Sequence, residues 1–223
     1  MYIHTNISVI VMTNQEYKNA ALAALKGNWA PAVLASIVYI LIAIAVSGCP
    51  ILIFGPASSL SSLSSLGVLL FMVPLEVGFY AAFVKLLTEG NTDITHEMFS
   101  LGFSGWLHKV LTMILMGILV MLGMFLFILP GIYLAFCYSM VPYLLYKHPE
   151  LSATETLKAS RIMMKGHKFD YFWLCLSFIG WIFLCFLTVG IGYFWLLPYM
   201  STSIDAFWED VYSQSKLAMG IDA

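Results

Sequence analysis

Long apolar runs alternate with short polar segments along this chain of 223 residues. Hydrophobic residues make up 61% of the chain and charged residues 10%, whereas soluble proteins carry about 25% charged residues. A run of about 20 apolar residues can cross the hydrocarbon core of a bilayer as one helix. The pattern therefore predicts a single compact all-α membrane domain without a soluble catalytic domain.

The lengths of the apolar runs predict about six transmembrane helices. The second of these ends near Glu89 and begins either at Leu66 or, with a proline in the first turn, at Pro74. The uncharged stretch 47–66 is predicted as an outer loop, and its serine-rich run either is flexible or forms a short helical turn. The other spans cover about residues 29–46, 109–129, the stretch from the Pro130-Gly131 turn to Tyr146, residues 169–187, and the stretch from the turn at 188–192 to Phe207.

The longest charged passage is residues 149–173, which lies between two apolar runs. Ser152 followed by Glu155 has the spacing of a capping box, so a helix should begin there. Gly166 can end this helix before the next apolar run starts. We interpret the passage as an amphipathic helix that lies against the cytoplasmic side of the membrane.

The same order of a capped amphipathic helix, a glycine and two spans occurs three times, which predicts a pseudo-threefold repeat. The units are residues 13–90, 91–148 and 149–212, and the alternative is chance similarity among apolar helices. A second capping box is formed by Thr13 and Glu16, and the helix of the middle unit begins at Asn91 or Thr92. Outside the units, residues 1–11 are predicted as a disordered extension and residues 213–223 as a cytoplasmic tail.

The charged residues predict the topology of the chain. All ten Lys and Arg residues lie in the N-terminal segment, in the connections after the second and fourth spans, or in the tail. Positive charge is retained on the cytoplasmic side of membrane proteins, so both termini should be cytoplasmic. Eleven of the twelve acidic residues fall on the same side, and Glu76 is the exception.

Glu76 is the candidate polar site within the membrane. If its span starts at Leu66, the carboxyl group lies near the middle of the bilayer and must be protonated, paired or facing a polar cavity. If the span starts at Pro74, Glu76 lies in the first helical turn near the outer surface. There it would only complement the helix dipole.

A basic cluster in the passage 149–173 is the second candidate site. Positive charge there can fix the topology, bind anionic lipids or bind a protein partner. The cluster consists of Lys158, Arg161, Lys165, His167 and Lys168.

The sequence contains no catalytic constellation, no phosphate-binding motif and no basic patch typical of nucleic-acid binding. His96, His108, His148 and His167 have no second His or Cys three or four residues away, so neither a metal nor another cofactor is predicted.

Several of these stretches together resemble the bacterial integral-membrane family called domain of unknown function 975. The resemblance covers most of the chain from Met12 to about Tyr212, and the part from Ser160 to Lys168 is the most specific. It implies a bacterial cytoplasmic (inner) membrane protein with six spans, but no known activity. The stretches that carry it are Pro74–Gly78, Leu129–Tyr133, Ala159–Arg161, Met164–Lys168, Trp181, Pro198–Tyr199 and Ala206–Glu209.

The function that these features favour is a non-enzymatic accessory or scaffold protein of the cell envelope. It would bind lipid or a protein partner at its cytoplasmic face. The alternative is a small transporter or channel, with a substrate path between the repeats near Glu76.

Overall fold

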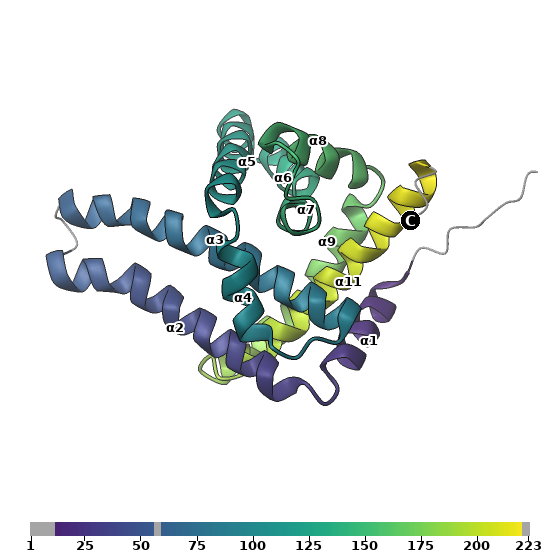
Figure 1. The fold of residues 1–223 in the computed structure, drawn as a ribbon, viewed down its shortest axis with the longest axis horizontal. Helices are drawn as coiled ribbons and strands as arrows, with labels where there is room; N and C mark the ends of the chain where they lie inside the picture. Colours follow the sequence, from purple (N-terminus) through teal and green to yellow (C-terminus); the bar gives the residue numbers. More distant parts are fainter. Residues whose placement is uncertain (1–11, 56–58, 220–223) are drawn as a thin grey trace, which may run out of the picture.

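The computed structural model describes residues 12–55 and 59–219, and all regular secondary structure within them is α-helical (Figure 1). The prediction of an all-α fold is confirmed. Residues 1–11, predicted as a disordered extension, lie outside the described residues. The helices are α1 (Asn14–Leu25), α2 (Trp29–Phe54), α3 (Ser59–Glu89), α4 (Ile94–Phe103), α5 (Trp106–Leu126), α6 (Ile128–Cys137), α7 (Val141–Lys147), α8 (Ala153–Met163), α9 (Lys168–Leu176), α10 (Ile179–Leu187) and α11 (Tyr193–Met219).

Within the described residues, five helical stretches are long and apolar enough to cross a membrane. Their surfaces expose large apolar side chains, such as Phe125 (89% exposed) and Phe186 (80% exposed). A folded chain that leaves such extensive apolar surface uncovered needs lipid around it. The predicted sixth span, ending near Phe207, is not among the five and stays a prediction. The five stretches are Trp29–Gly48, Leu70–Glu89, Trp106–Leu126, Ile128–Lys147 and Lys168–Leu187.

The prediction of a loop over residues 47–66 is wrong for most of that stretch. Helix α2 continues to Phe54, and α3 already begins at Ser59, so the serine-rich run is α-helical from there on. Serine side chains can bond to carbonyl groups of their own helix, as Ser47 does with the carbonyl oxygen of Ala43 (2.5 Å). This local bonding makes a serine-rich helix compatible with an apolar environment.

Pro74 lies inside α3 and does not begin it, so the shorter of the two predicted second spans is wrong. A proline removes one backbone hydrogen bond from a helix interior. In α3 the same region packs closely against α4, which stabilises the helix from outside. Glu76 therefore lies in the interior of a long helix, 13 residues or about 20 Å before its end at Glu89.

The fourth and fifth predicted spans are each interrupted. Residues 138–140 separate α6 from α7, and residues 177–178 separate α9 from α10. The carbonyl oxygens freed at these breaks accept hydrogen bonds from other helices. Ser160 Oγ donates to the carbonyl of Cys137 (2.9 Å), and Lys18 Nζ donates to that of Ser177 (3.3 Å).

The turn between the third and fourth spans was also predicted slightly too late in the sequence. The chain reverses at Phe127, which has an extended backbone, and Pro130 and Gly131 lie in the first turn of α6. Proline is well accommodated there because the first amide groups of a helix have no partner within it. Gly131 instead allows α6 to pack closely against α5, because a Cβ atom on Gly131 would lie 2.7 Å from the Cα atom of Met124.

The three polar helices α1, α4 and α8 each precede a pair of apolar helices. Both predicted capping boxes are present, from Thr13 to Glu16 and from Ser152 to Glu155. The third cap was predicted wrongly. α4 begins after Asp93, because the Asn91 side chain accepts the Asp93 amide (3.0 Å) in a local turn.

All three polar helices are followed by a glycine with positive φ, at Gly27 (86°), Gly105 (59°) and Gly166 (99°). Glycine adopts this left-handed conformation without the steric cost of a Cβ atom. The recurring turn supports the predicted repeat, which itself stays a prediction.

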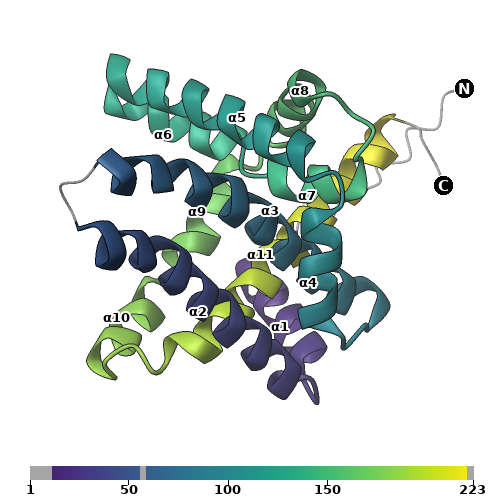
Figure 2. The same cartoon turned by 60° about the vertical axis from the view of Figure 1, so that its left-hand side comes forward.

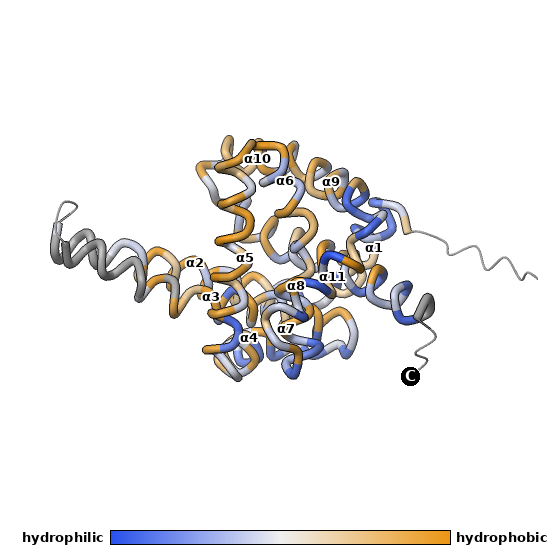
Figure 3. The backbone as a smooth tube through the Cα atoms, turned by 90° about the horizontal axis from the view of Figure 1, so that it is seen from above, coloured by the Kyte–Doolittle hydropathy of each residue, from blue (hydrophilic) through white to orange (hydrophobic). Residues whose placement is uncertain are grey.

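Polar and apolar ends can be distinguished in the molecule. The end of α2, the start of α3 and the α5–α6 and α10–α11 connections point to one side, on the left of Figure 2, and the polar helices lie toward the other side. Figure 3 shows the apolar character of α5, α6 and α10 and the polar residues gathered around α1, α4, α8 and the end of α11.

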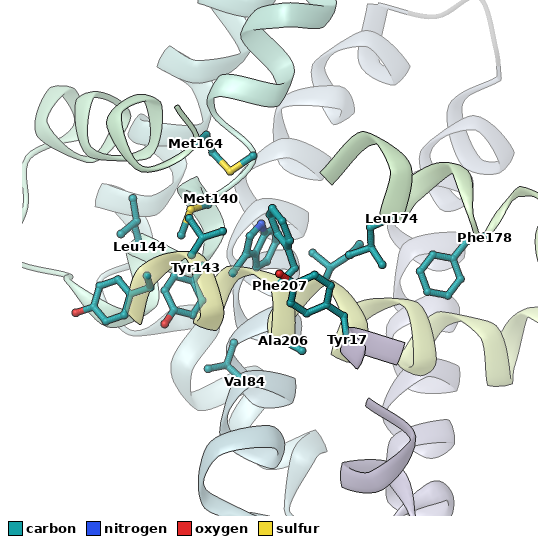
Figure 4. Packing of buried hydrophobic residues seen from close by; sticks show 14 of the residues in the cluster. Tyr17, Val84, Met140, Tyr143, Leu144, Met164, Leu174, Phe178, Ala206 and Phe207 are labelled. Carbon is teal, nitrogen blue, oxygen red and sulfur yellow. The ribbon is translucent and has the colours of Figure 1, made fainter. Parts of the chain in front are cut away.

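Helix α11 forms the centre of the bundle, and most of its residues from 196 to 208 are buried. Figure 4 shows Tyr17 of α1, Val84 of α3 and Tyr143 of α7 converging on α11 around Phe207. The rings of Tyr17 and Phe207 are in edge-to-face contact, with centroids 5.5 Å apart.

We expect Gly78→Ala to lower the free energy of unfolding, because α3 and α4 meet backbone to backbone at this residue. A Cβ atom on Gly78 would lie 2.7 Å from the Cα atom of Gly102, so the helices would have to move apart. The expected loss is about 1–3 kcal/mol, measured as thermal unfolding in detergent. Gly67→Ala in the same helix is the control, since its Cβ atom would meet nothing within 4 Å. Equal stability of the two variants would contradict this packing.

Candidate functional site

The predicted basic cluster lies at the end of α8 and the start of α9. Lys158, Arg161 and Lys165 are exposed, and none of them forms an ion pair with another described residue. The other two members are engaged. His167 Nδ1 lies 3.7 Å from the carboxylate of Asp170, and the Lys168 ammonium group lies 4.8 Å from the centre of the Tyr133 ring. The cluster thus has three charges available for a ligand.

An apolar groove of about 450 Å³ adjoins this cluster, between α6 and α9. Leu129, Ile132 and Phe169 form its walls, while Gly166 and Lys168 contribute to its lining from the polar turn. Phe169 is 74% exposed, so its ring is available to an apolar ligand. Sequence analysis found the charges but not the groove, because the groove needs α6 and α9 to be side by side.

Glu76 lines a second, larger cavity of about 550 Å³ among the helices, which is open to the surface beside the exposed Met121 of α5. Its side chain makes no hydrogen bond or ion pair with any other described residue. The simple role as a dipole partner in a first helical turn is therefore wrong, since α3 begins 17 residues earlier, at Ser59. Of the predicted possibilities, the structure supports a carboxyl group that faces a cavity.

Asp205 is a candidate site residue that the sequence analysis missed. It is completely buried in α11, and neither of its carboxyl oxygens has a hydrogen-bond partner. Asp205 was counted among the acidic residues of the cytoplasmic side because it lies only two residues before the predicted end of a span. Its position before the end of a predicted span was the available signal.

The polar residues that follow Asp205 connect α11 to the neighbouring helices. Tyr143 donates to Glu209 (2.6 Å), and Lys147 lies 3.3 Å from the same carboxylate. Tyr17 of α1 donates to Asp210 (2.7 Å). Burial, together with this hydrogen bond, raises the pKa of Tyr17 above its usual value, so its hydroxyl stays a donor at any physiological pH.

Lys109 also differs from its predicted role, which was only to keep a connection cytoplasmic. Its side chain is buried, and its ammonium group donates to the carbonyl oxygens of Leu101, Gly102 (3.2 Å) and Ser104 (2.7 Å). These groups belong to the end of α4, where carbonyls have no partner within the helix. Lys109 therefore joins α5 to the end of α4.

The histidines do not form a metal site in the described part of the chain, where no three His, Cys, Asp or Glu side chains lie close enough to hold an ion. His148 has a different role, because its ring bonds to Tyr212 (2.7 Å) and to Glu150 (2.8 Å).

Five membrane-length apolar stretches in the described residues define an integral, multi-pass membrane protein. The family model described as "Protein of unknown function (DUF975)" matches residues 126–215, from the end of α5 to near the end of α11. The predicted resemblance to this family is confirmed over these residues, which include α8 and the basic cluster. No curated protein and no solved structure is significantly similar to the chain.

Lys109→Met should destabilise the protein, because methionine keeps the apolar stem but leaves the end of α4 without its donor. Hydrogen bonds from a charged group contribute about 1.5–3 kcal/mol, so a loss of about 2 kcal/mol is expected in detergent unfolding. Lys26→Met is the control, since Lys26 is exposed at the end of α1. A variant of Lys109 as stable as the control would exclude this structural role.

Proposed function

We propose that this protein is a non-enzymatic accessory or scaffold protein of the bacterial inner membrane that binds anionic phospholipid at its cytoplasmic face. The binding surface consists of the exposed basic residues at the end of α8 and the groove between α6 and α9. The observation that supports it is an apolar groove whose lining includes the Lys168 side chain and the turn next to Lys165.

The groove and the charges fit the two parts of a phospholipid. An acyl chain can lie along Leu129, Ile132 and Phe169, which are exposed on spans that lipid would surround. The phosphate group would then reach the cationic side chains of Arg161, Lys165 and Lys168. Each basic residue near an anionic membrane surface contributes about 1 kcal/mol to such binding.

The orientation needed for this function agrees with the distribution of charge. All ten Lys and Arg residues lie in the segments assigned to the cytoplasmic side or within a few residues of the span ends that border them, and bacterial membrane proteins retain positive charge on that side. In this orientation both termini are cytoplasmic, and α8 faces the leaflet from the inside of the cell.

Neutralising two charges should weaken the binding of phosphatidylglycerol without changing the fold. In the double variant Arg161→Gln, Lys165→Gln we expect the binding free energy to weaken by about 2 kcal/mol, which corresponds to roughly 30-fold lower affinity. The full chain in nanodiscs of neutral lipid would be titrated with phosphatidylglycerol, and phosphatidylcholine would serve as the neutral probe.

The single variants Lys165→Gln and Lys26→Gln form a matched pair, because both lysines are exposed and directly precede a positive-φ glycine. Only the first should reduce binding, by about fivefold. Equal loss in both variants, or equal affinity for phosphatidylcholine, would disprove a lipid site at α8. A protein that copurifies in stoichiometric amount and is lost in the double variant would instead identify this surface as a partner site.

Transport is the second candidate function, because Glu76 lines a cavity inside the membrane-spanning part of the bundle. Polar groups at such depth are found mainly on solute paths and proton relays. If this protein is a transporter, Glu76→Gln should abolish solute flux in proteoliposomes while the lipid affinity of the α8 surface stays unchanged.

A further inference from the structure

The interior cavity lies among α3, α5, α6, α7, α9 and α11, and its volume of about 550 Å³ is in the range of sites for small organic ligands. It is separate from the lipid surface at α8. Its walls combine a carboxyl group, aromatic rings and flexible thioethers, and these three features restrict the ligand that it can hold.

The only carboxyl group in the cavity lining is that of Glu76, and no basic residue lines the cavity to pair with it. Glu76 lines it without a partner among the described residues, and none of the lining residues is Lys, Arg or His. Asp205 does not line the cavity, but it lies three residues before the lining residue Trp208 in α11 and is completely buried without a hydrogen-bond partner. A desolvated carboxyl group without a partner favours its neutral form, and a bound cation would stabilise the ionised form of Glu76.

The aromatic residues of the wall are suited to a cation. Tyr80, Tyr138, Tyr171 and Trp208 line the cavity, and the rings of Tyr80 and Trp208 lie 5.2 Å apart. The faces of such rings attract organic cations, most strongly where water is excluded. Trp208 is 2% exposed, and its Nε1–H group has no acceptor in the described protein. The wall thus offers an unused polar group in addition to the Glu76 carboxyl.

The opposite wall is apolar and adaptable. Met113, Met116, Met121 and Met124 all project from α5 into the cavity lining. Methionine side chains are flexible and polarisable, so they adjust to apolar bodies of different shape. Gly117 lies among them, and a Cβ atom on it would meet nothing within 4 Å, which leaves room for the ligand.

We infer that this cavity binds hydrophobic organic cations, such as quaternary or protonated amines with an apolar body. Glu76 provides the countercharge in the cavity when the cation is bound. The tyrosine and tryptophan rings surround the cationic centre, and the methionines of α5 surround the apolar body. This inference concerns binding, and it holds whether or not the cation is transported.

The test compares two probes of nearly the same size and shape but opposite charge, tetraphenylphosphonium and tetraphenylborate. The full chain in nanodiscs would be analysed by equilibrium dialysis, with empty nanodiscs subtracted to remove partitioning into lipid. We expect saturable binding of the phosphonium cation only. Equal binding of the borate anion, or no saturable binding of the cation, would overturn the inference.

Glu76→Gln should lower the affinity for the cation at least about tenfold, because it removes a desolvated countercharge with little change in shape. Glu89→Gln is the matched control on the same helix, since Glu89 is exposed. If Glu76→Gln does not fold, Gly117→Leu provides the second test of the site, because the leucine side chain would fill the cavity and leave both carboxyl groups intact. If the folded cavity variants bind the cation as tightly as the wild-type protein does, the proposed site is wrong. Lipid binding at α8 should be unchanged in these variants.

Discussion

Polar groups inside an apolar bundle have to find their partners within the protein, because the bilayer core provides no water. Most of this structure follows that constraint. Lys109 donates to carbonyl oxygens at the end of α4, and Ser160 donates to one at the end of α6. Lys18 donates to a carbonyl oxygen at the break between α9 and α10. Helix α11 is the centre on which these contacts depend, since its acidic residues hold Tyr17 and Tyr143. The interrupted helices are stable because other helices supply the missing donors.

In two places of the described chain, charged or carboxyl side chains without a partner lie beside a cavity or groove, and both places are candidate sites. In the interior, Glu76 and Asp205 keep carboxyl groups without partners around a cavity. At the polar end, Arg161 and Lys165 keep their charges exposed beside an apolar groove. Ionising an unpaired buried carboxyl group costs free energy, and the exposed basic residues have no partner in the isolated chain. A bound ligand of opposite charge would pair with these groups. The interior site fits a cation, and the surface site fits an anionic headgroup.

The sequence predicted the helical class, the capping boxes and the family resemblance, because these depend on local spacing and composition. It failed where tertiary contacts override local signals. Pro74 is typical of a helix start, yet α3 passes through it and packs against α4 there. The serine-rich run is typical of a loop, yet it is helical from Ser59. Asp205 was counted with the acidic residues of the cytoplasmic side, and only the packing around α11 shows that it is buried. The groove and the cavity have no local signal at all.

Native mass spectrometry of the full chain, released from its own membrane in gentle detergent, tests the proposed lipid surface most directly. The account predicts that the wild-type protein retains anionic phospholipid, and that the variant carrying Arg161→Gln and Lys165→Gln loses it while keeping its fold. A wild-type protein that carries no lipid, or only zwitterionic lipid retained equally by the variant, would contradict it.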